Sequence, residues 1–181
     1  MKNESLESYS TRIADRITLP DPVIVGLSFG GMMAIEIAKI IPVKKIILIS
    51  SAKGKKELPP YFTVCRYIPF HKLLPLHAKG SRTKILFYIL GAKNEDQKKY
   101  LQDNIRINNR TGFNTWAIDK VVRWNNTEAV PNLVHIHGNK DKLLPHRYVK
   151  VDHMIANGGH LLIVNQAKEV SALLQKLVPL Y

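Results

Sequence analysis

The chain has 181 residues and a mass of 20.6 kDa, a length that suits one domain with a sizeable core. Hydrophobic residues make up 45% and charged residues 23%, which excludes disordered and collagen-like chains. The net charge is +13, and +9 of it comes from residues 53–110, where 13 Lys and Arg stand against 4 Asp and Glu.

Apolar patterns of two kinds alternate along the first fifty residues. Residues 5–18 place Leu6, Tyr9, Ile13 and Ile17 three or four apart, which predicts a short amphipathic helix. Residues 23–25 are a short β-branched run, and residues 46–49 are a second apolar run. Both runs are too uniformly apolar for exposed edges, so they predict buried parallel strands. Helical spacing in residues 32–41 separates them.

The last fifty residues return to the same alternation. Residues 133–136 predict a third strand, and a weaker strand is expected around residues 149–154. Residues 166–177 carry their apolar side chains on one helical face, which predicts a closing helix. Strands alternating with helices predict an α/β fold class, in which a parallel sheet is flanked by helices on both faces.

Residues 53–132 interrupt this alternation. Helix-like stretches cover residues 85–90, 94–107 and 113–124, with no strand pattern between them. We therefore expect a helical insertion between the second and third strands, within a single domain that spans residues 1–181. The aromatic residues at the end of this region have helical spacing, which fits packing of the insertion or a substrate box; they are Phe113, Trp116 and Trp124.

A Gly-x-Ser-x-Gly motif follows the first predicted strand and precedes a helix. It consists of Gly26, Ser28 and Gly30, with Phe29 after the serine. In this setting a strained turn exposes the serine hydroxyl, and we expect Gly26 and Gly30 to be needed because side chains there would not fit. The Phe29 backbone N–H is expected to be one donor of an oxyanion hole. The alternative is a glycine-rich turn with an incidental serine.

A serine nucleophile needs a base and a group that orients the base. Asp141 follows the third predicted strand, at the same edge of the sheet as Ser28, and His160 follows a glycine-rich loop further on. His160 fits the base and Asp141 the orienting acid. Each could instead be an ordinary loop residue, but the order Ser, Asp, His after successive strands favours a functional set.

These three motifs resemble those of the α/β-hydrolase superfamily. The segment 26–31 resembles the nucleophile elbow of the family, residues 137–141 its acid loop, and residues 158–160 its base loop. The resemblance implies a serine esterase or thioesterase that works through an acyl-serine, with Ser28, Asp141 and His160 as catalytic residues and Phe29 in the oxyanion hole. The insertion at 53–132 has the position of the family's lid.

The sequence departs from the family before the elbow. Family members have further strands there, including one whose His-Gly-type loop supplies the second oxyanion donor, and residues 1–27 contain no such motif. The chain therefore resembles a truncated α/β-hydrolase fold. We expect residues 23–25 to form an exposed apolar edge, which a second copy of the chain, rearranged structure or an upstream segment would cover.

The remaining features limit compartment and partners. Glu36 and Lys39 interrupt the longest apolar stretch, so no transmembrane segment is expected. The first residues lack the apolar core that a secretory signal needs, and Cys65 is the only cysteine, so a cytoplasmic location is expected. His135 and His137 have no convincing third ligand, so neither a metal nor a cofactor is predicted. No nucleic-acid-binding module is recognisable.

Two functional hypotheses follow. The first is a serine hydrolase that cleaves an ester or thioester of a small-molecule or carrier-bound acyl group, with an anionic donor favoured by the basic insertion and with a homo-oligomer formed through the exposed edge. The alternative is a catalytically weak or silent binding or assembly module, because the first half of the family pattern is missing.

Overall fold

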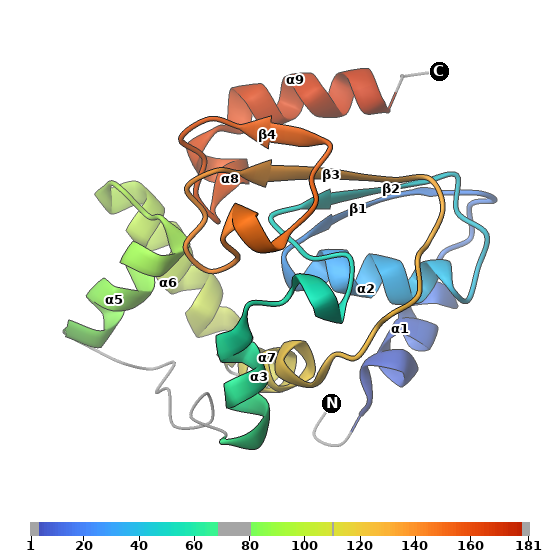
Figure 1. The fold of residues 1–181 in the computed structure, drawn as a ribbon, viewed down its shortest axis with the longest axis horizontal. Helices are drawn as coiled ribbons and strands as arrows, with labels where there is room; N and C mark the ends of the chain where they lie inside the picture. The colour runs from blue at the N-terminus through green and yellow to red at the C-terminus, as the bar shows by residue number, and fades with distance from the viewer. Residues whose placement is uncertain (1–3, 69–80, 110, 179–181) are drawn as a thin grey trace.

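A four-stranded parallel sheet with the order β1-β2-β3-β4 forms the centre of the molecule (Figure 1). The structure is a computed structural model, and it describes residues 4–68, 81–109 and 111–178. The strands are β1 Val23–Leu27, β2 Lys45–Ile49, β3 Leu133–Gly138 and β4 His153–Ile155. The first three strands confirm the predicted ones; the fourth is shorter than predicted and begins later, because residues 149–152, which follow η2 (His146–Tyr148), form no strand.

The inner strand β2 is apolar on both faces because helices cover both of them. Ile46, Ile47 and Leu48 are fully buried. Leu27 lies opposite Ile49, which lies opposite Ile136, so the carboxyl ends of β1, β2 and β3 are in register. Loops that follow these strands therefore meet at one edge of the sheet.

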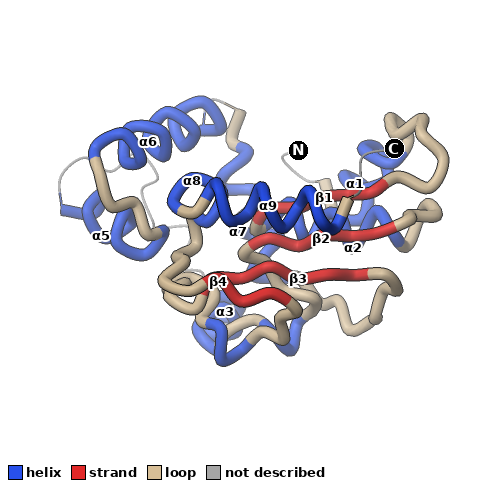
Figure 2. Tube along the Cα trace, turned by 90° about the horizontal axis from the view of Figure 1, so that it is seen from above, coloured by secondary structure: helices blue, strands red, loops and turns tan. Residues whose placement is uncertain are grey.

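Helices cover the two faces of the sheet, as the alternating pattern predicts (Figures 1 and 2). One face packs against α1 (Leu6–Ala14), α2 (Phe29–Ala38) and α7 (Phe113–Arg123). The other face packs against α8 (Leu162–Asn165) and α9 (Ala167–Leu177), which lies across the top in Figure 1. The described chain has the predicted α/β architecture, with a helical layer on each side of the sheet.

Helices fill the described parts of the segment between β2 and β3. After the short η1 (Lys55–Glu57) these are α3 (Pro60–Tyr67), α5 (Ser81–Leu90), α6 (Glu95–Asn109) and α7. The sequence did not predict α3, and residues 69–80 and 110 of the expected insertion lie outside the described residues. Figure 1 shows α5 and α6 beyond the carboxyl ends of the strands.

The end of the insertion is part of the core. Trp116 and Trp124 are buried, and their indole N–H groups donate to the Glu4 carbonyl at 2.9 Å and to the Glu36 carboxylate at 2.8 Å. Both residues thus tie the region of α7 to the layer that holds α1 and α2. Of the two readings of these aromatic residues, the structure favours packing.

Strand β1 is an edge of the described sheet, as expected. It pairs with β2, and within residues 4–22 only the helix α1 comes before it. Val25 remains 48% exposed, which is unusual for an apolar residue in a strand next to the core. In the described part of the chain, no helix combines the length and apolarity needed to cross a membrane.

Candidate active site

Ser28 lies in a strained turn between β1 and α2. Its φ is 51° and its ψ is −118°, outside the regions that residues other than glycine usually occupy. Its backbone N–H donates to the Ile49 carbonyl at 2.8 Å, and its own carbonyl accepts from the Ser51 hydroxyl at 2.7 Å. Contacts from the end of β2 therefore hold the Ser28 backbone in this conformation.

The glycines around Ser28 have different roles. A Cβ at Gly26 would lie 2.4 Å from the Gly30 carbonyl oxygen, so the close approach of strand and helix requires glycine there. The expectation for Gly30 is wrong, because a Cβ at that position would meet no atom within 4 Å. The second essential glycine is Gly31, where a Cβ would lie 2.5 Å from the Ser51 hydroxyl.

This difference predicts opposite outcomes for two alanine substitutions in the same turn. Gly26→Ala is expected to lower the free energy of unfolding by about 2 kcal/mol or more, because backbone must move. Gly30→Ala is expected to change it by less than about 0.5 kcal/mol, since the added methyl group meets open space. Urea denaturation followed by circular dichroism measures both. Equal losses in the two variants would contradict the described geometry.

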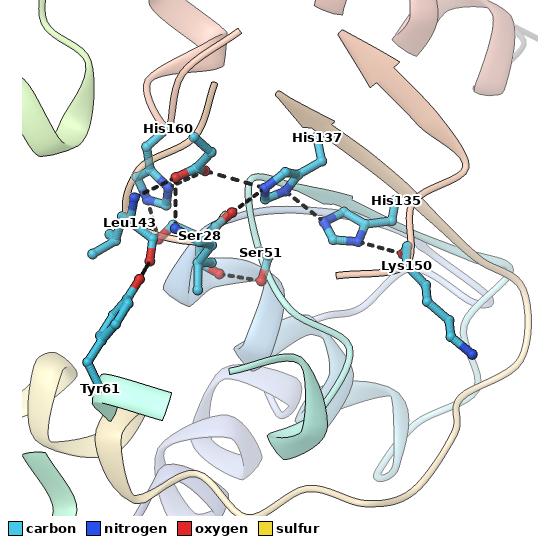
Figure 3. A network of polar contacts seen from close by, with 10 residues as sticks. Ser28, Ser51, Tyr61, His135, His137, Leu143, Lys150 and His160 are labelled. Carbon is cyan, nitrogen blue, oxygen red and sulfur yellow. Dashed lines mark hydrogen bonds and ion pairs between the residues drawn. The ribbon is translucent and has the colours of Figure 1, made fainter. Parts of the chain in front are cut away.

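A continuous hydrogen-bonded chain joins Ser28, His160 and Asp141 (Figure 3). The Ser28 hydroxyl lies 2.9 Å from His160 Nε2, and His160 Nδ1 lies 2.8 Å from Asp141 Oδ2. Because the carboxylate can only accept, His160 Nδ1 carries the hydrogen and Nε2 is free to accept from the serine. The structure thus brings together the three residues that the sequence singled out, although 132 positions separate Ser28 from His160.

The Asp141 carboxylate is buried and fully engaged. Its Oδ1 accepts the backbone N–H groups of Leu143 and Leu144, each at 2.8 Å, while Oδ2 faces His160. Asp141 is 4% exposed and His160 6%. Two donors on one oxygen fix the carboxylate plane, so the other oxygen remains aimed at the imidazole ring.

Phe29, whose backbone N–H the resemblance implies as an oxyanion donor, begins α2 directly after Ser28. Phe29 is the first residue of α2, and the first N–H groups of a helix have no partner within it. The positive end of the helix dipole favours negative charge at the same place. The Phe29 ring is anchored against Phe113 and Trp116, with ring centroids 6.0 and 5.7 Å away.

The helical insertion contacts the loop that carries Asp141 and the loop that carries His160. From α3, the Tyr61 hydroxyl donates to the Leu143 carbonyl beside Asp141, and burial together with the nearby carboxylate raises the pKa of Tyr61 to about 12. At the end of α5, the Leu90 carbonyl accepts the Leu161 N–H at 3.1 Å. Helices between β2 and β3 therefore contribute to the position of Asp141 and His160.

A pair of buried histidines adjoins Asp141. His135 and His137 on β3 are both fully buried, and burial lowers both pKa values, that of His135 to about 3. His137 Nε2 lies 2.7 Å from the Leu144 carbonyl oxygen. Among the described residues, no group of three or more His, Cys, Asp or Glu side chains could hold a metal ion.

The sequence patterns did not predict the contacts that three further residues make in this site. Ser51 holds the Ser28 carbonyl, Tyr61 holds the acid loop, and His137 contacts that loop from β3. Ser51 could have been found from its position directly after β2, at the edge where the strands end. Tyr61 belongs to no motif. His137 is the first residue of the acid-loop motif, but that motif does not indicate which atoms its side chain contacts.

Similar solved structures share this arrangement of strands and helices. A thermophilic esterase from Thermogutta terrifontis superposes with a TM-score of 0.71 and 17% identity, over 96% of this chain and 71% of its own. A meta-cleavage product hydrolase from Pseudomonas fluorescens has a TM-score of 0.63 and 18% identity, over 97% and 72%. This chain has an α/β-hydrolase fold.

A bromoperoxidase from Bacillus anthracis has the same hydrolase fold, with a TM-score of 0.63 and 17% identity over 96% of this chain and 74% of its own. No protein-family model matches the sequence, and no curated protein matches it. The hydrolase fold is therefore shown by structure, at identities too low to transfer an activity. Each of these structures is longer than the part that this chain matches.

Proposed function

We propose that the protein is a serine hydrolase that cleaves a carboxylic ester or thioester through an acyl-serine intermediate. The observation that carries this proposal is the unbroken hydrogen-bonded chain from the Ser28 hydroxyl through His160 to the buried Asp141. The strained turn at Ser28 and the helix N-terminus beside it support the same chemistry. The similar structures include a thermophilic esterase and a meta-cleavage product hydrolase, which supports the proposal.

In the proposed reaction each residue has a step. The Ser28 oxygen attacks the carbonyl carbon while His160 Nε2 takes its proton, and Asp141 stabilises the resulting imidazolium. The Phe29 N–H donates to the carbonyl oxygen as it becomes negative. His160 then returns the proton to the leaving alcohol or thiol. In the second half, His160 takes a proton from the water that attacks the acyl-serine. It returns this proton to the Ser28 oxygen as the bond to the acyl carbon breaks and the acid leaves.

A panel of short-chain nitrophenyl esters tests the proposed activity. Saturable turnover is expected in the wild type and in Ser171→Ala, a control that removes an exposed serine on α9. Absence of saturable turnover across the panel would contradict the proposal and favour the alternative, a silent binding or assembly module. That alternative rests on residues 4–22, where the structure shows a helix and no strand that could supply a second oxyanion donor.

We propose further that the acyl donor is anionic, because residues 53–110 carry +9 of the net charge and two of their helices, α3 and α5, contact the loops of Asp141 and His160. Opposite charge accelerates capture and is screened by salt, with a Debye length of about 10 Å at 0.1 M. The kcat/KM for a coenzyme A thioester is expected to fall as salt rises. That for a neutral ester serves as the control and should remain nearly constant. Equal responses of the two would contradict an anionic donor.

The exposed edge at β1 leads us to propose a two-fold homodimer. Val25 is 48% exposed on this edge strand, and pairing or coverage by a second copy would remove that apolar surface from water. Multi-angle light scattering at micromolar concentration is expected to give twice the mass of the 181-residue chain. A stable monomer would contradict this proposal.

The single cysteine agrees with a reducing compartment, and we propose the cytoplasm.

A further inference from the structure

A buried chain of polar contacts continues from Asp141 away from Ser28 (Figure 3). His137 Nε2 lies 2.7 Å from the Leu144 carbonyl oxygen and 3.5 Å from Asp141 Oδ2. His137 Nδ1 lies 3.3 Å from His135 Nε2, and His135 Nδ1 lies 3.2 Å from the Lys150 carbonyl oxygen. Neither ring has exposed surface, so water does not compete for these contacts.

The two carbonyl groups decide where the ring hydrogens are. A carbonyl oxygen only accepts, so His137 Nε2 and His135 Nδ1 must each carry a hydrogen to make the outer bonds. Each neutral imidazole has one N–H hydrogen, so the two rings have no others on nitrogen. The inner nitrogens, His137 Nδ1 and His135 Nε2, therefore face each other with lone pairs at 3.3 Å. The three contacts of the two rings therefore share only two N–H hydrogens, and the contact between the rings has none.

Leu144 connects this pair to the carboxylate of Asp141. Its carbonyl accepts from His137, and its N–H donates to Asp141 Oδ1 at 2.8 Å. Deepening the function proposed above, we propose that His137 is a positioning residue that orients Asp141 through Leu144, that His135 fixes its tautomer, and that the two rings together accept a single proton. That proton would lie between His137 Nδ1 and His135 Nε2 and form the hydrogen bond that the neutral pair lacks.

Some charged groups around the two histidines favour binding of this proton, and others oppose it. The carboxylates that favour it come from three segments: Glu57 in η1, Asp141 after β3, and Asp152 before β4. Lys53 and a protonated His160 oppose it. Burial also opposes it and lowers the pKa of both histidines, so the pair is neutral near pH 7 and binds its proton only in acid.

Histidine ¹⁵N NMR of the full chain tests the tautomers without any need for activity. Near pH 7 we expect the hydrogen on Nδ1 in His135 and on Nε2 in His137, each assigned by its single His→Gln variant. On acidification both rings should change together, with one shared midpoint, which burial places below the ordinary range of histidine. Any other tautomer pair, two separate midpoints, or unfolding before the shared proton enters would overturn the proposal.

Ester kinetics separate positioning from packing. His137→Leu is expected to lower kcat by up to about 10²-fold with KM unchanged, because a displaced acid loop misplaces His160. In His137→Gln the amide N–H can replace Nε2–H toward Leu144, so most of kcat should return. His146→Gln, which removes an exposed histidine in η2, is the control. Equal kcat in the Leu and Gln variants would overturn the positioning role. If the wild type hydrolyses no ester but shows the expected tautomers by NMR, only the proposed function is refuted.

Discussion

Replacing Ser28 with alanine is expected to reduce kcat/KM for ester hydrolysis by at least about 10³-fold, since no other described group is placed to attack the carbonyl in contact with His160. The remaining rate would come from the oxyanion donor and substrate binding alone. Initial rates with the best ester of the panel measure the loss.

The fold should survive this substitution, because within the described residues the Ser28 side chain hydrogen-bonds only to His160, while backbone contacts hold the turn. Circular dichroism and the urea midpoint of Ser28→Ala are therefore expected to match the wild type. A variant that is folded and retains more than a tenth of the activity would show that another residue is the nucleophile.

Asp141→Asn is expected to reduce kcat by about 10³–10⁴-fold, and the hydrogen bonds around the residue give the reason. The Oδ1 position accepts two backbone N–H groups, from Leu143 and Leu144, so the amide must place its oxygen there. Its NH₂ group then faces His160 Nδ1, which must become an acceptor. The hydrogen of His160 moves to Nε2, and that nitrogen can no longer take the proton of Ser28.

The matched control for this variant is Asp152→Asn. Asp152 also accepts a backbone N–H, that of His135 at 2.8 Å, but its carboxylate is 45% exposed and does not contact His160. Its activity is expected to remain within a few-fold of the wild type. Similar losses in the two variants would mean that the exchange harms the fold and that Asp141 has no special relation to His160.

Much of the core could be predicted because it depends on local pattern. The runs at residues 23–25, 46–49 and 133–136 are apolar enough to be buried on both faces, and they became β1, β2 and β3. Their parallel register then places the segments after them at one edge. This is why the order Ser28, Asp141, His160 in the sequence was enough to predict that the three side chains meet.

Features that depend on contacts between distant segments could not be predicted. The need for glycine at position 31 arises from Ser51 in a different loop, and the need at position 26 from the approach of α2 to β1. A motif shows that glycines recur but not which atoms they face, so the motif wrongly predicts a need for glycine at position 30. The hydrogen bond from Tyr61 to Leu143 joins residues 82 positions apart, and a pattern within either segment contains no trace of it.

The central claim is that Ser28 is a nucleophile activated by His160, and labelling with a fluorophosphonate probe tests it most directly. Peptide mass spectrometry of the labelled wild type is expected to place one adduct on Ser28. Ser28→Ala should give no adduct, and His160→Ala should react far more slowly because the hydroxyl lacks its base. An adduct that persists in Ser28→Ala, or a folded wild type that the probe leaves unlabelled, would contradict the claim.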